Sequence, residues 1–158
     1  MVTIKITIKE HLKEYVTGKF NYGEDKPVQF PHEYDIYHLI FDLTEKRPAG
    51  VVDDGNLEIF LPEPRNGGKK TSTYNYLRGR SQYIIESKIE TMMWAELHDL
   101  LDYNKHKLGL QYNETVYLFM KKYHIESITE DALIKNYYRH REKIRRRNQR
   151  QKYAKQNN

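Results

Sequence analysis

The chain has 158 residues, of which 27 are lysine or arginine and 22 are aspartate or glutamate, giving a net charge of +5. This length fits one domain of ordinary size, and the absence of cysteine excludes disulfides, cysteine-ligated zinc and a thiol nucleophile. Apolar runs are only a few residues long, so we expect no membrane partner and a cytoplasmic location.

The first half of the chain predicts a small layer of strands with two helices. Val2, Ile4, Ile6 and Ile8 alternate with polar residues, a period of two that is typical of a half-buried strand. Spacings of three and four between apolar residues predict the helices. The expected elements are a strand over 2–8, helices over 10–20 and 33–46, and strands over 28–30 and 56–61.

The second half predicts three helices. The longest spans about 76–105, and a shorter one spans 113–123 with Asn113 as its N-cap. The apolar stripe of the long helix exceeds what a small strand layer obviously covers, which suggests the hypothesis of a homodimer. The last helix is predicted to begin near Glu130, and it has almost nothing apolar to bury beyond Ile144.

Charge is distributed unevenly between the two ends of the chain. Residues 135–158 carry ten basic residues and one acid, Glu142, for a net charge of +9, which leaves −4 for residues 1–134. A concentrated positive charge indicates an anionic partner or a solvated arm.

A short helix, a turn and a basic helix predict a helix-turn-helix-like unit at the C-terminus. Arginine pairs with phosphate oxygens and with guanine edges, so the preferred partner is DNA. RNA, an acidic protein partner and a merely solubilising tail remain as alternatives. The residues expected to contact nucleic acid are Lys135, Arg139, Arg141, Lys143, Arg145, Arg146, Arg147 and Arg150.

A second basic segment interleaves cations with Tyr74 and Tyr76. Such a loop can hold a phosphate backbone and stack a base, although most basic loops are simply solvated. The residues of this secondary contact are Arg65, Lys69, Lys70, Arg78 and Arg80.

Motifs for catalysis, a cofactor or a metal are not expected. His98, Asp102 and His106 share one face of the long helix, but no adjacent glutamate completes a hydrolase motif, and lysines beside them oppose a cation. Gly-rich phosphate loops and nucleophile elbows are missing as well. We therefore predict a non-enzymatic protein with no catalytic residues, no metal and no cofactor.

Several segments resemble a group of small proteins encoded by Mu-like phages and other mobile elements of Bacteroides-type bacteria. They are residues 55–59 (GNLEI), 74–77 (YNYL), 89–98 (IETMMWAELH) and 130–139 (EDALIKNYYR). The resemblance implies a regulator or accessory factor of a mobile element and slightly favours DNA over RNA. It supplies no catalytic residues.

The sequence as a whole predicts an α+β fold. A small β-containing N-terminal layer is expected over 1–75, and a helical part with the long helix and the basic helical hairpin over 76–150. Residues 151–158 are predicted to be a disordered tail because they are almost entirely polar.

Overall fold

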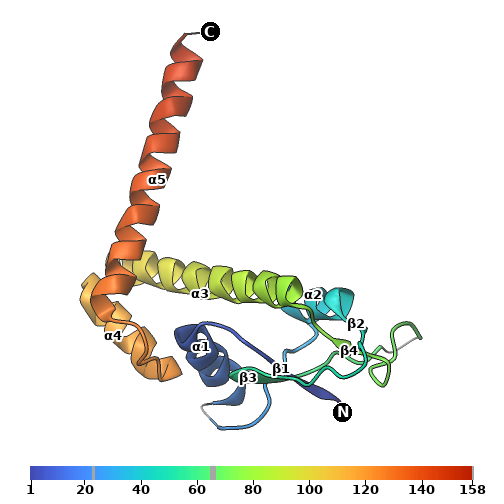
Figure 1. Ribbon diagram of the computed structural model, residues 1–158. Coiled ribbons are helices and arrows are strands. Elements are labelled where there is room, and N and C mark those ends of the chain that lie inside the picture. Colours follow the sequence, from blue (N-terminus) through green and yellow to red (C-terminus); the bar gives the residue numbers. More distant parts are fainter. Residues whose placement is uncertain (23, 65–66, 158) are drawn as a thin grey trace.

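The computed structural model describes residues 1–22, 24–64 and 67–157 and confirms the α+β class (Figure 1). Within these residues, short strands form two small sheets and most of the regular structure is helical. The elements in chain order are β1 (Thr3–Ile6), α1 (Glu10–Asn21), α2 (Asp35–Leu43), β2 (Glu45–Lys46), β3 (Leu57–Phe60), β4 (Tyr74–Tyr76), α3 (Gly79–Lys107), α4 (Tyr112–Tyr123) and α5 (Glu130–Gln156).

The alternating apolar residues of the first strand are buried, as predicted for a half-buried strand. β1 pairs with β3 in antiparallel register, with Ile4 opposite Ile59 and Ile6 opposite Leu57, and these four side chains are buried. The strand expected over 28–30 is reduced to a single bridge between Val28 and Ile59. This sheet therefore forms one wall of the core, with its buried face supplied by β-branched and leucine side chains.

The second helix ends at Leu43, three residues before the predicted end at residue 46. α2 stops at Leu43, and Glu45–Lys46 instead form β2, which pairs with β4. The Lys69 ammonium donates hydrogen bonds to the carbonyls of Asp42 and Thr44, at 2.6 and 2.9 Å. A lysine that satisfies the last carbonyls of a helix stabilises its end, and this partner is 25 residues away from Thr44 along the chain.

The apolar stripe of α3 is covered within the chain itself. Its buried apolar residues, from Ile85 and Ile89 to Leu101, are fully inaccessible to solvent, and α3 packs against α1, α2 and α4. The observation that suggested a homodimer, an uncovered stripe, therefore does not hold. Because α3 contacts helices from both predicted parts, residues 1–75 and 76–150 share one hydrophobic core.

The end of the chain projects from this core. Figure 1 shows α5 leaving the far end of α3 and pointing away from the other elements. Residues 151–156, for which the sequence predicts disorder, continue this helix to Gln156. Among the described residues, no helix combines the length and apolar character needed to cross a bilayer.

Candidate nucleic-acid interface

The base of α5 is fixed by a helix cap and two buried side chains. The Thr129 hydroxyl accepts a hydrogen bond from the Ala132 amide at 3.1 Å, which makes it the N-cap. Leu133 is fully buried, and Tyr137 is 1% exposed. The helix therefore starts where the sequence predicts, and its first two turns belong to the core.

Polar contacts attach the next turns of α5 to α3 and α4. The Tyr137 hydroxyl donates a hydrogen bond to Asp102, and its ring lies 5.1 Å from that of Tyr112. The Arg141 guanidinium donates to the Tyr112 hydroxyl at 3.1 Å. These contacts give the arm a defined point of departure, because a single buried aromatic residue supplies both packing and a directional hydrogen bond.

Beyond Ile144, every described residue of α5 is exposed, through Asn157. Glu142 is the one acid of the basic segment, and it accepts hydrogen bonds from Arg145 at 2.9 Å and from Arg146 at 3.1 Å. The hydrogen bond from Arg145, followed by that from Arg146, lowers the pKa of Glu142 below its ordinary value, although burial acts in the opposite direction. This half of α5 is thus a solvated helix whose charge is largely uncompensated.

The structure places all eight residues of the predicted contact on the exposed surface of α5. Some of them have acidic partners: Lys135 pairs with Asp131 at 2.8 Å, and Arg145 and Arg146 pair with Glu142. Arg141 has the Tyr112 hydroxyl as its partner. Four residues of the set form no ion pair within the described chain: Arg139, Lys143, Arg147 and Arg150.

These four unpaired cations share one side of the helix. Their spacing of four, four and three residues places them within about 80° of one another around the axis, at 100° per residue. We call Arg139, Lys143, Arg147 and Arg150 the basic stripe. It runs from the attached base of α5 to its projecting half, so it presents a continuous line of positive charge.

The order helix, turn, helix is present in α4 and α5, but the charge lies at the opposite end from that of a DNA-binding helix-turn-helix. In that motif the N-terminal residues of the second helix contact the bases. Here the first turn of α5 carries Glu130 and Asp131 and packs against the core. The helix-turn-helix interpretation therefore stays a prediction, and most of the basic residues of α5 lie in its projecting half.

The predicted secondary contact is separated from the arm by the length of α3, roughly 40 Å for 29 residues. Two of its cations have other partners: Lys69 binds the carbonyls at the end of α2, and Arg78 forms a two-pronged ion pair with Glu45. Lys70 and Arg80 are exposed. Arg65 lies outside the described residues.

Of the three residues His98, Asp102 and His106 on one face of α3, the first two contact α5, and His106 is exposed. The His98 ring nitrogen Nε2 lies 3.1 Å from Asn136 Oδ1, and Asp102 accepts from Tyr137. In the part of the chain that the structure describes, no group of three or more histidine, aspartate or glutamate side chains is placed to hold a metal ion.

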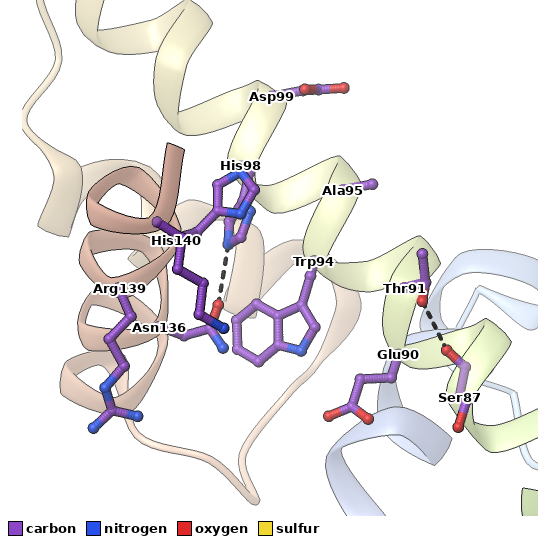
Figure 2. Close-up of a pocket in the computed structure, with 11 residues that line it drawn as sticks. Ser87, Glu90, Thr91, Trp94, Ala95, His98, Asp99, Asn136, Arg139 and His140 are labelled. Atoms are coloured by element: carbon purple, nitrogen blue, oxygen red, sulfur yellow. Dashed lines mark hydrogen bonds between the residues drawn. The ribbon is translucent and has the colours of Figure 1, made fainter. Parts of the chain in front are cut away.

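A groove between α3 and α5 is the feature that the sequence did not predict. It has a volume of about 710 Å³, and its walls include Trp94 and His98 from α3 and Asn136 and His140 from α5 (Figure 2). Trp94 and His98 are four residues apart in α3, and Asn136 and His140 are four residues apart in α5. This spacing places the two side chains of each pair on one face of their helix. The sequence offers no signal that these two faces, about 40 residues apart, meet.

Comparisons with known proteins give a limited result. No protein-family model matches the chain, and no solved structure matches it. A segment of 67 residues is 30% identical to the "Uncharacterized protein ORF39" of Ictalurid herpesvirus 1 (strain Auburn), covering 42% of this chain and 5% of the viral protein. The chain thus corresponds to a small fraction of that relative. The similarity is to a viral protein and does not extend to the Mu-like phage proteins of Bacteroides-type bacteria.

Proposed function

We propose that this protein binds nucleic acid, with DNA as the preferred partner, through the basic arm formed by the exposed residues of α5. The observation that carries the proposal is the combination of ten basic residues and one acid over residues 135–158 with a helix whose described residues beyond Ile144 are all exposed. Phosphate neutralisation by lysine and arginine supplies most of the affinity of such a surface.

The role that fits this surface is that of a binding protein and not an enzyme. Phosphate contacts position a protein on nucleic acid, whereas sequence is read by contacts to base edges. The arm offers many groups for the first task, so we propose a regulator or accessory factor that binds with little sequence preference. The partial similarity to an uncharacterised herpesvirus protein supports a viral setting for this role.

The test is the salt dependence of binding to a labelled DNA duplex, followed by fluorescence anisotropy. The variant R145Q/R146Q/R147Q removes three charges from the arm. We expect it to weaken binding to all sequences and to reduce the slope of log K against log salt by about 2 to 3, since each lost phosphate contact contributes about 0.9.

A matched control removes the same charge from the body. Lys5, Lys107 and Lys121 are exposed and form no ion pair among the described residues, so K5Q/K107Q/K121Q changes the net charge equally. The proposal requires the control to retain nearly all of the affinity. Equal losses in both variants would show that only the net charge matters, and tighter binding to polyglutamate than to DNA would favour an acidic protein partner.

A further inference from the structure

The groove between α3 and α5 lies at the base of the basic arm. Its walls come from one face of each helix (Figure 2). A volume of about 710 Å³ falls in the range of sites that hold small organic groups. The groove therefore offers a binding surface of its own beside the charged helix.

One wall of the groove is aromatic. The Trp94 indole lies 5.8 Å from the His98 ring, and the His98 and His140 rings lie 4.4 Å apart with an angle of 32° between their planes. Trp94 is partly exposed although it packs against the core. His98 is buried, so the Trp94 indole is the ring of this wall on which a planar ligand can stack.

The polar groups of the groove can orient such a ligand. Asn136 Oδ1 lies 3.1 Å from His98 Nε2, an arrangement in which the imidazole donates and the amide oxygen accepts. Figure 2 shows the amide nitrogen of Asn136 turned toward the Trp94 indole. An amide group carries two N–H donors, so Asn136 can donate to a carbonyl on the edge of a planar ring.

The basic stripe begins at the rim of this groove. Arg139 and Lys143 line it, and the other two stripe residues continue along α5 on the same side. Two acids also line the groove. Glu90 forms an ion pair with Lys9 at 3.3 Å, and Asp99 points away from His98 in Figure 2. The anionic part of a ligand is therefore favoured on the α5 side.

We propose that the groove takes an unpaired nucleobase of single-stranded nucleic acid, stacked on Trp94, while Arg139 and Lys143 hold the adjoining phosphates. The inference rests on the proposed function and narrows it, because bases inside a duplex are stacked on each other and do not reach a groove of this kind. Aromatic stacking combined with a charged track is the usual way in which proteins bind single strands.

Trp94 is the single tryptophan of the chain, so its fluorescence reports on the groove directly. The full chain is titrated with a thymidine oligonucleotide and with an abasic oligonucleotide that has the same number of phosphates. We expect both to bind, as measured by anisotropy, but only the thymidine strand to quench Trp94 and to bind about 10-fold more tightly.

Three variants separate stacking from phosphate contact. W94L should lose the roughly 10-fold advantage of the thymidine strand and leave binding of the abasic strand unchanged. Tyr103 is exposed on the opposite side of α3, so Y103L is the matched control and should retain the advantage. W94F keeps a smaller ring and should retain part of it, provided that circular dichroism shows the same helix content in all three variants.

The outcomes distinguish this inference from the proposed function. If both strands bind equally and quench Trp94 equally or not at all, the groove holds no base, and the arm alone binds phosphate. If neither strand binds at low salt, the proposed function fails and the groove proposal fails with it.

Discussion

Glu96 is the residue at which three helices of the core meet. From α3 it accepts hydrogen bonds from the hydroxyls of Tyr15 in α1 and Tyr123 in α4, and it pairs with Lys19 at 3.0 Å. Burial would raise the pKa of Glu96, but the hydrogen bonds from Tyr123, Tyr15 and Lys19 outweigh it, so the pKa lies below its ordinary value. A charged acceptor shared by two tyrosines fixes the relative positions of these helices.

Replacing Glu96 with alanine is expected to destabilise the protein by about 3 kcal/mol, because two partly buried hydroxyls and an ammonium group lose their acceptor. The measurement is the free energy of unfolding in urea at neutral pH. The control is E90A, which breaks only the more exposed pair with Lys9 and should cost less than about 1 kcal/mol. Similar losses in the two variants would contradict the central role of Glu96.

Two histidines make stability depend on pH. Burial, followed by the charge of Lys9, lowers the pKa of His11, whose Nε2 is buried without a partner in the described chain. Burial lowers the pKa of His98 as well, and nearby His140 acts in the same direction. For both, the folded state favours the neutral ring, so the unfolded state binds more protons below about pH 6.5.

The free energy of unfolding is therefore expected to fall as the pH drops from about 7 through the ordinary histidine pKa of about 6.5 and on to the lowered pKa of the folded state. Urea unfolding at about pH 7.5 and about pH 5.5 measures the change. The variant H11Q/H98Q should lose most of this dependence. An equally steep dependence in that variant would assign it to other groups. The stabilisation that ionised Glu96 provides is separate from this effect. It is lost only at more acidic pH, as the pH falls through the lowered pKa of Glu96.

At the scale of elements, the approach of α1 to α4 depends on Gly18. An added Cβ at this position would lie 2.4 Å from the carbonyl oxygen of Tyr123, so the two backbones could not stay as close. Alanine normally stabilises a helix interior relative to glycine, but here we expect G18A to destabilise the protein by about 2 kcal/mol through overpacking.

Thermal unfolding of G18A and G79A tests this contact. Gly79 begins α3, and a Cβ added there meets nothing within 4 Å, so G79A should change stability by less than about 0.5 kcal/mol. If the two variants melt at the same temperature, α1 and α4 are not in close contact at Gly18.

Local periodicity predicted the elements whose hydrophobic pattern is long enough to be distinctive. α1, α3 and β1 are of this kind, because each buries a face that repeats along several residues. The cap of α4 was predicted two residues late, at Asn113, since the capping box that forms is between Gln111 and Glu114. β2 and the end of α2 depend on β4 and Lys69, which are distant in sequence, and no local pattern encodes such contacts.

One part of the candidate site, the basic arm, could be predicted from the sequence, and the other part, the groove, could not. The basic arm is visible in the sequence because charge is a property of single residues, and the unbroken exposure of α5 beyond Ile144 follows from its lack of apolar side chains. The groove is not visible, since it requires that Trp94 in α3 and Asn136 in α5 face each other. Side chains that are 42 positions apart are brought together by the packing of the base of α5, where Leu133 and Tyr137 are buried in the core.

At the scale of the whole molecule, the fold and the proposed binding surface occupy separate parts of the chain. Residues 145–157 bury no side chain, so they contribute to the core neither apolar area nor hydrogen bonds. Truncation after Ile144 should therefore leave the free energy of unfolding within about 0.5 kcal/mol of the full chain.

The same truncation removes six of the ten basic residues of the arm and should weaken binding to DNA by more than about 10-fold at moderate salt, with a smaller salt slope. Urea unfolding and anisotropy on one preparation measure both properties. A stable truncated protein that binds DNA as well as the full chain would place the interface on the body. A clear loss of stability would show that the arm folds back onto the core, because a helix that contacts only solvent cannot stabilise it.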